Sequence, residues 1–375
     1  MAKELGRADQ FEKPNVAIYF GDSGVEKEDP FFDGKGPKRT GCIFCGGCMT
    51  GCRHNAKNTL DKNYLYLAQQ LGAEILAEHE VYDVKEIDGE GYKIFTKKST
   101  SFIKKSRSFK AKGVIFSGGV LGTIKLLLKL KIGSLPKISD RIGQDIRTNN
   151  ETLISVSTTE KGKDLSKGIA IGSLLHTDDN SHLEIVRYSK GSDFWKLSHF
   201  PYSTGNHFFS RFFGMIRSVL SAPLQYLKIY SRAWASNTVV LLFMQSLDST
   251  IRFKKNIFGG ISSHKGKGNL PTINLPESIE LTKKYAKIIK GKPTSFALES
   301  IAGIPSTAHI LGGAVMGKNE SEGVINDHNQ VFGYENMYVI DGSMISANPG
   351  VNPSLSITAI AERAMSFIPN AENAT

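Results

Sequence analysis

Cysteine is scarce in this chain of 375 residues, and all four cysteines lie between residues 42 and 52. The lack of cysteine elsewhere argues against a secreted protein that is held together by disulfides. Bridges inside the cluster are also disfavoured, because cysteines two or three residues apart rarely reach the Cα separation that a disulfide needs without strain.

Long apolar runs are missing as well. No run reaches the roughly 18 residues that a membrane-spanning helix requires, and the N-terminal residues contain no apolar core of a signal peptide. We therefore expect a cytoplasmic protein or one that binds a membrane peripherally. Membrane contact is one interpretation of residues 207–230, a helical stretch rich in phenylalanine that Pro223 interrupts, and ordinary core packing is the other.

Acidic residues are fewer than basic ones, 36 against 47, so the net charge is +11. The lysines are nevertheless scattered, and no nucleic-acid-binding motif is present. The excess therefore indicates a basic solvated surface rather than nucleic-acid binding. The motif G-x-S-x-G is absent too, which removes the support for a serine nucleophile of that type.

The cysteine-containing stretch, CIFCGGCMTGC, places Cys42, Cys45, Cys48 and Cys52 in the spacing C-x2-C-x2-C-x3-C. The glycines between them would let the backbone wrap tightly around a small inorganic core. The same spacing occurs in the iron–sulfur ligation of bacterial ferredoxins, and we therefore predict an iron–sulfur cluster here. Structural zinc and four free thiols in a buried loop are the alternatives that the spacing leaves open.

Two segments have the pattern of a strand that delivers a ligand-binding turn. Residues 114–116 predict a short buried strand, which is followed by Gly118, Gly119 and a helix over 121–130. Residues 337–340 predict a second strand, which ends at Asp341 and Gly342. In open α/β sheets, ligands bind at the carboxyl ends of the strands, and a glycine turn before a helix brings backbone amides to a dinucleotide.

A helix is predicted to begin at Asn352, with Asn352 as its N-cap and Pro353 as its first residue. A wide buried face is expected on this helix from Leu355 to Ile368. Its positive N-terminal end would stabilise an anionic ring, and we expect His309, in a separate segment, to approach the same point. Between residues 151 and 301 several alternating stretches predict a mostly antiparallel sheet.

These residues carry a family resemblance. The segments AHILGG, NMYVIDGS and GVNPSLSITAIAERA resemble the C-terminal signature of the glucose–methanol–choline (GMC) oxidoreductases, FAD enzymes that oxidise alcohols. The segments AKNTLDKNYLYLA, GVIFSGGVLGT and RIGQDIRTNNE resemble the same family, and in particular its cholesterol-oxidase-like branch. The resemblance runs over nearly the whole chain in the correct order.

The resemblance implies a mixed α/β fold, in which an incomplete doubly wound FAD-binding domain accompanies a substrate domain with a mostly antiparallel sheet. Residues 1–72 would form a cap or substrate region that carries the cysteine cluster. Residues 73–150 and 311–375 would form parts of the FAD-binding domain, and residues 151–310 the substrate-binding domain.

The resemblance also implies roles for single residues. His309 and Asn352 would be the catalytic pair that acts while a hydride passes from a bulky apolar alcohol, such as a sterol, to flavin N5. A second carboxylate base occurs in some sterol-oxidising relatives, and Glu151 and Glu299 are candidates for it. The residues expected to bind FAD are Gly118, Gly119, Asp341, Gly342, Asn352 and Pro353.

One part of the family pattern is absent, namely the strand and G-x-G-x-x-G turn that hold the FAD pyrophosphate. We therefore expect the chain to correspond to the C-terminal two-thirds of such an enzyme. The alternative function is an inactive or partial flavoprotein that needs a separate N-terminal FAD-binding fragment. Both an oxidase and a dehydrogenase remain open. An iron–sulfur cluster would carry electrons from the flavin to an external acceptor and would therefore favour a dehydrogenase, because oxygen as acceptor needs no cluster.

Overall fold

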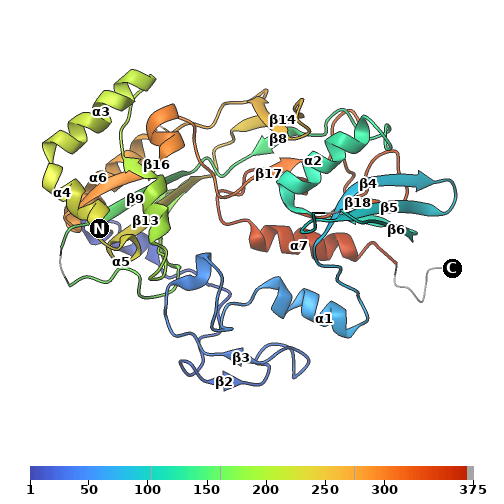
Figure 1. Ribbon diagram of the computed structural model, residues 1–375, viewed down its shortest axis with the longest axis horizontal. Coiled ribbons are helices and arrows are strands. Elements are labelled where there is room, and N and C mark those ends of the chain that lie inside the picture. The colour runs from blue at the N-terminus through green and yellow to red at the C-terminus, as the bar shows by residue number, and fades with distance from the viewer. Residues whose placement is uncertain (103, 161, 274, 370–375) are drawn as a thin grey trace. The chain divides into compact units, whose positions relative to one another are not determined.

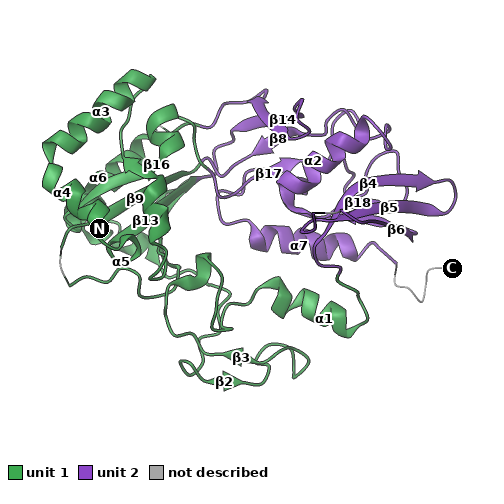
Figure 2. Cartoon of the chain, viewed as in Figure 1, with its two compact units in different colours: residues 1–75, 151–244, 272–306 green, residues 76–150, 245–271, 307–375 purple. Residues whose placement is uncertain are grey.

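The structure is a computed structural model that describes residues 1–102, 104–160, 162–273 and 275–369 (Figure 1). The chain forms two compact units, which are described separately below (Figure 2). Unit 1 comprises Met1–Ile75, Glu151–Met244 and Thr272–Ser306, and unit 2 comprises Leu76–Asn150, Gln245–Pro271 and Thr307–Thr375. Residues 245–271, which the sequence assigned to the substrate region, therefore cluster with unit 2. The expected mixed α/β fold is confirmed.

The main sheet of unit 1 has the strand order β1-β10-β11-β13-β9-β16-β12. Its strands are β1 (Phe11–Glu12), β9 (Thr152–Thr158), β10 (Ile171–Asp178), β11 (Ser181–Val186), β12 (His199–Pro201), β13 (Thr238–Gln245) and β16 (Gly291–Phe296). The strand β9 pairs antiparallel with both β13 and β16, in agreement with the mostly antiparallel sheet that the sequence predicted. Every residue of β13 except Gln245 is buried, which explains its continuous apolar sequence.

The helices of unit 1 are α1 (Tyr64–Gln70), α3 (Phe208–Ser221), α4 (Pro223–Ser231), α5 (Trp234–Asn237) and α6 (Pro276–Ile288). Two short strands, β2 (Glu26–Lys27) and β3 (Arg39–Thr40), pair with each other. Pro223 separates α3 from α4 as predicted, because proline has no N–H to continue α3 but fits the first turn of a new helix. Among the described residues, none of the helices is both long and apolar enough to cross a membrane.

Unit 2 contains both short strands that the sequence predicted, β7 (Val114–Phe116) and β18 (Met337–Val339), and the structure pairs them in parallel. The helix α2 (Gly119–Lys131) follows β7, and α7 (Ser354–Met365) lies near the C-terminus. One antiparallel sheet has the order β4 (His79–Ile87), β5 (Gly91–Lys98), β6 (Ser106–Ala111), and another has the order β15 (Ile261–Lys265), β14 (Thr250–Lys255), β8 (Gln144–Arg147), β17 (Leu311–Gly313).

The core of unit 2 forms where α2 packs against the parallel pair. Ile124, Leu127 and Leu130 of α2 are fully buried together with Met337 and Val339 of β18. Their spacing of three residues along α2 places them on one face of the helix. The helix is therefore held firmly behind the turn that precedes it.

The last helix begins two residues later than predicted, and the prediction of a wide buried face is wrong. The helix α7 begins at Ser354, directly after Pro353, which already has helical dihedral angles. Leu355 and Phe367 are exposed, and Ala364 is the one fully buried residue of α7 within the described chain. The helix covers the core only with a narrow stripe, formed by Ala364 and by partly buried Ile357, Ile360 and Ala361.

Candidate functional site

The carboxyl ends of β7 and β18 lie side by side. Val114 pairs with Met337, and Phe116 pairs with Val339, in parallel register. Beyond this point the chain from β7 turns through Gly118 into α2, and the chain from β18 turns through Asp341. The pairing continues one step further, since the N–H of Ile340 donates to the carbonyl of Phe116 at 3.0 Å. The glycine turn and the Asp341–Gly342 turn, predicted separately from the sequence, therefore meet at one edge.

A chain of hydrogen bonds joins these two turns. Asp341 is only 7% exposed, and its Oδ2 accepts a hydrogen bond of 2.5 Å from the hydroxyl of Thr123 on α2. Thr123 Oγ1 in turn accepts from the N–H of Gly118 at 3.1 Å. Asp341 Oδ1 accepts from the N–H of Ser343 at 2.8 Å and from the Ser343 hydroxyl. These contacts fix the orientation of the Asp341 carboxylate. The sequence analysis assigned Asp341 to FAD binding but did not predict this hydrogen-bond network.

The sequence analysis missed Thr123, which holds Asp341. Its hydroxyl group donates a hydrogen bond to Asp341, which lies 218 positions later in the sequence. Nothing in the local pattern of α2 identifies a buried hydroxyl group with such a partner. The one available signal was its position as a polar residue on the buried face of the helix.

The start of α2 is open to a ligand. Gly119 has φ of 72°, a conformation that other residues rarely adopt, and a Cβ added there would meet nothing within 4 Å. A Cβ added at Gly342 would lie 3.2 Å from Val120 Cγ2, a tight contact that glycine avoids where the second turn lies close to α2. Open space, free approach to the backbone and a helix N-terminus are what an anionic phosphate group requires. The residues present therefore fit the FAD that the resemblance implies.

A cavity of about 930 Å³ lies beside β7 and is lined also by α2, β4 and β5. Within the described part of the chain, β7 pairs with β18 alone, and Ile115 of β7 is exposed. The side chains of Lys97, Lys125, Lys129 and Lys255 contribute to the cavity, together with Glu80. The cavity thus combines a free strand edge with an excess of positive charge, which favours an anionic ligand.

His309 is half-buried and lies two residues before β17. Its N–H donates to the Oγ1 of Thr307 at 3.0 Å, which fixes the turn. Gly312 has φ of 77°, and a Cβ added there would lie 2.3 Å from the carbonyl oxygen of Asp145. The glycines that follow His309 are therefore needed so that β17 can pair closely with β8.

Asn352 is half-buried and directly precedes Pro353 and α7. Its segment is held by two other amides that the sequence analysis missed. Fully buried Asn149 donates to the carbonyl of Val351 at 2.7 Å, and Asn348 donates to the carbonyls of Gln245 and Leu247, both at 2.8 Å. His309 and Asn352 both belong to unit 2, and the pairing of their side chains at one substrate remains a prediction.

The two candidate carboxylates lie in unit 1 and are both buried. Glu299 belongs to a π-helical turn, Leu298–Ala302, a feature that is frequent at functional sites. Burial and, to a smaller extent, the nearby charge of Glu151 raise the pKa of Glu299 to about 7, although the N–H of Ser306, which donates to Oε1 at 3.0 Å, lowers it. A carboxyl group with a pKa near neutrality is suited to proton transfer.

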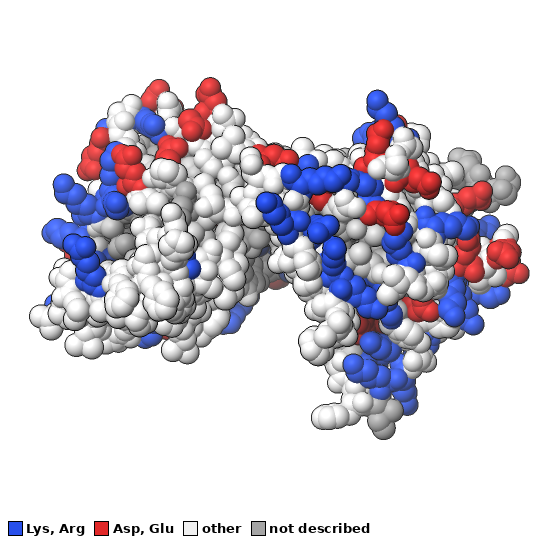
Figure 3. Space-filling model, turned by 90° about the horizontal axis from the view of Figure 1, so that it is seen from above, with Lys and Arg blue, Asp and Glu red and all other residues white. Residues whose placement is uncertain are grey.

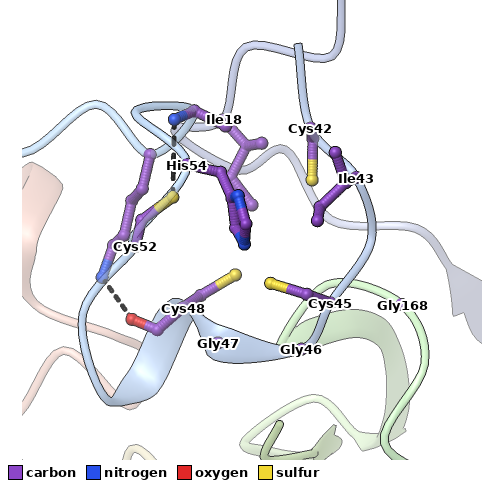
Figure 4. Close-up of a pocket in the computed structure, with 12 residues that line it drawn as sticks. Ile18, Cys42, Ile43, Cys45, Gly46, Gly47, Cys48, Cys52, His54 and Gly168 are labelled. Carbon is purple, nitrogen blue, oxygen red and sulfur yellow. Dashed lines mark hydrogen bonds between the residues drawn. The ribbon is translucent and has the colours of Figure 1, made fainter. Parts of the chain in front are cut away.

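The four cysteines line one small pocket together with His54 (Figure 4). In this view the sulfur atoms of Cys45 and Cys48 point toward each other. However, the described residues contain no group of three or more His, Cys, Asp or Glu side chains that could hold a metal ion. The geometry therefore gives no support to the iron–sulfur cluster predicted from the spacing, nor to zinc.

The loop that carries the cysteines is held by its glycines, as the sequence suggested. The N–H of Gly46 donates to the carbonyl of Gly168 at 2.7 Å, and the N–H of Gly168 donates to the carbonyl of Phe44 at 2.8 Å. Gly46 has φ of 72°, and a Cβ there would lie 2.3 Å from the carbonyl oxygen of Ser166. The loop is thus clamped to the segment before β10.

The environments of two of the thiols differ. Burial raises the pKa of Cys42. Burial acts in the same direction on Cys52, but the backbone N–H groups of Lys57, Ala56 and His54 outweigh it and lower the pKa of Cys52. The N–H of Ala56 donates directly to Cys52 Sγ at 3.4 Å.

Comparison with known proteins places these features in context. A family model described as GMC oxidoreductase matches residues 282–361, a range that includes His309, Asp341 and Asn352. A cholesterol oxidase of Acinetobacter baumannii is 42% identical, over 98% of this chain and 69% of its own length. A cholesterol oxidase of Mycobacterium tuberculosis is 38% identical, over 99% of this chain and 67% of its own length. The chain thus spans about two-thirds of these relatives.

Solved structures agree in fold. A pyridoxine 4-oxidase from Mesorbium loti superposes with a TM-score of 0.51 and 13% identity, covering 84% of this chain and 62% of that chain. A formate oxidase from Aspergillus oryzae superposes with the same TM-score and identity, covering 81% and 62%. At this identity the likeness concerns the fold alone.

The two thiols should react at different rates. At pH 7.5 we expect iodoacetamide to alkylate Cys52 several-fold faster than Cys42, because only the thiolate reacts and Cys42 is both buried and harder to ionise. Mass spectrometry of timed digests measures both rates, and the urea-unfolded chain, in which the rates should converge, is the control. Equal rates in the folded protein would contradict the contrast in pKa.

Glu299 should make stability depend on pH. Folding raises the pKa of Glu299 from 4.5 to about 7, so the free energy of unfolding should fall by up to about 3 kcal/mol as the pH rises through this window. The variant Glu299→Gln should therefore melt at a higher temperature than the wild type at pH 8 and not at pH 5. The exposed Glu26→Gln is the matched control. A pH-independent difference between Glu299→Gln and the wild type would show that the carboxyl group does not titrate as described.

Proposed function

Because the chain belongs to the GMC oxidoreductase family, we propose that it acts in the FAD-dependent oxidation of a bulky apolar alcohol of the sterol class. The observation that carries this proposal is the 42% identity to a cholesterol oxidase over 98% of the chain. The paired turns at the ends of β7 and β18 support it, because they offer the open helix terminus and glycine approach that FAD needs.

Each residue of the proposed site has a task. Gly118, Gly119 and Gly342 allow FAD to approach the backbone, and Asp341, fixed by Thr123, holds the two turns together. Asn352 and Pro353 present the positive N-terminal end of α7 to the flavin. When bound, FAD would accept the hydride from the alcohol carbon.

The proton of the alcohol needs a separate acceptor. A half-buried imidazole such as that of His309 is suited to it, because histidine is the side chain that most often serves as a general acid–base group. The amide of Asn352 would hold the substrate oxygen. Glu299, with its raised pKa, is the candidate for a second base.

The test is an oxidation assay with cholesterol in detergent micelles and excess FAD, in which the ketone is measured by mass spectrometry. Cholestane, which lacks the hydroxyl group, is the substrate control. The variant His309→Ala should lower turnover by about 100-fold or more, as loss of an acid–base group commonly does. The exposed His264→Ala, also in unit 2, should leave turnover unchanged.

Two results would count against this proposal. Near-full turnover by His309→Ala would remove His309 from the proton transfer. Failure of the chain to form ketone while FAD is bound would remove the sterol oxidation itself.

A second candidate is a partial flavoprotein that needs a separate N-terminal fragment to hold FAD. The free edge of β7 and the cavity of about 930 Å³ beside it favour this candidate, since a further strand could add to that edge. We expect FAD added during expression to be lost on desalting, so that the visible spectrum shows little flavin. A stoichiometric flavin spectrum after desalting would contradict this candidate.

A further inference from the structure

The helices α3 and α4 of unit 1 expose many of their large apolar side chains. The outward residues of α3 are aromatic or aliphatic, with Phe209 70%, Phe213 64% and Leu220 72% exposed. On α4, Leu224 is 70% and Leu227 66% exposed. A helix of a soluble protein ordinarily turns such residues to the core, so this face requires an explanation.

The opposite face of the same helices is held by polar contacts. Arg211 is buried, and its guanidinium donates to the carbonyls of Ile301 at 3.1 Å and Gly205 at 2.9 Å. Ser218 on α3 bonds to the hydroxyl of buried Tyr226 on α4 at 2.6 Å. These specific contacts fix the orientation of the pair, so the outward direction of the phenylalanines is not a consequence of loose packing.

The outward residues form one continuous stripe. On α3 the positions 208, 209, 212, 213, 216 and 220 all fall on one side of a helix with 3.6 residues per turn, opposite Arg211 and Ser218. On α4, Leu224 and Leu227 face outward, while Tyr226 and Ile229 are buried. We call this exposed set, on both helices, the aromatic face.

The charged side chains on the two helices of the aromatic face are all basic. No acidic residue occurs between Asp193 and Asp248, whereas Arg217 and Lys228 lie exposed on the two helices. Elsewhere Lys and Arg side chains are mixed with Asp and Glu, as Figure 3 shows for one side of the molecule. The two helices thus combine exposed large apolar side chains with basic residues and no carboxylates.

We propose that the aromatic face is a docking surface for the anionic headgroup region of a lipid bilayer. Phenylalanine and leucine would enter the boundary between headgroups and acyl chains, while Arg217 and Lys228 would remain at the phosphate level. The absence of carboxylates in this stretch of sequence removes the repulsion that an anionic surface would otherwise exert. The helices lie on the membrane and do not cross it.

This inference does not depend on the proposed oxidation, because lipid binding needs neither sterol nor FAD. If both hold, the consequence is that a water-insoluble alcohol is taken from the membrane in which it resides. If oxidation fails and vesicle binding persists, only the proposed function is lost.

The test is flotation of the purified chain with sterol-free vesicles. The vesicles contain phosphatidylcholine and about 30 mole per cent phosphatidylserine, which gives their surface a negative potential. We expect the wild type to float with these vesicles and to bind less at high salt. The double variant Phe209→Ser/Phe213→Ser should bind the vesicles at least about tenfold more weakly than the wild type, because it removes apolar area from the aromatic face. The variant Arg217→Gln/Lys228→Gln should lose the preference for anionic vesicles.

The matched control is Ile257→Ser/Phe258→Ser, which removes two apolar side chains from the turn between β14 and β15 of unit 2. These side chains are 93% and 90% exposed, more than Phe209 and Phe213. It should bind like the wild type, and circular dichroism should show that every variant retains its helices. Equal loss in the control, or no flotation of a folded wild type at any lipid composition, would overturn the proposal. Sedimentation of the wild type as a dimer that Phe209→Ser/Phe213→Ser converts to monomers would overturn it too, by assigning the face to a second copy of the chain.

Discussion

The parallel pairing of β7 with β18 is the constraint on which unit 2 depends. It joins segments more than 200 residues apart in sequence, and the hydrogen bond from Thr123 to Asp341 secures the join where both strands end. Because α2 follows β7 directly and packs through Ile124 and Leu127 on the core, its N-terminus cannot move away from Asp341. The two glycine turns are thereby held together at the edge where we propose that FAD binds.

The chemistry of the chain is divided between its two units, each described by itself. Unit 2 carries the glycine turns, Asp341, His309 and Asn352, which suit cofactor and proton chemistry. Unit 1 carries the buried carboxyl group of Glu299, the clamped cysteine loop and the outward phenylalanines of α3. In each unit buried polar side chains hold these segments by donating hydrogen bonds to backbone carbonyls. Asn149 does so in unit 2 and Arg211 in unit 1. Such hydrogen bonds offset the free-energy cost of removing a polar group from water.

Much of this could be predicted from the sequence, where the signal is local. The apolar run of β13, the glycine turn after β7 and the break at Pro223 all follow from the residues at those positions. The predictions that failed depend on residues distant in the sequence. The narrow buried stripe of α7 is determined by the core residues that it packs against. Thr123 could not be identified because its partner, Asp341, is distant in the sequence. The cysteine spacing predicted a cluster, but spacing along the chain does not fix the directions of four sulfur atoms, and their geometry does not support a metal site.

The central claim is that FAD binds at the carboxyl ends of β7 and β18. Hydrogen–deuterium exchange of the chain with and without saturating FAD tests it most directly, because it reports on individual backbone amides and does not require turnover. The account predicts slower exchange at residues 117–123 and 341–343, with little change at the cysteine loop or in α3. Unchanged exchange at both turns, with protection elsewhere, would contradict it.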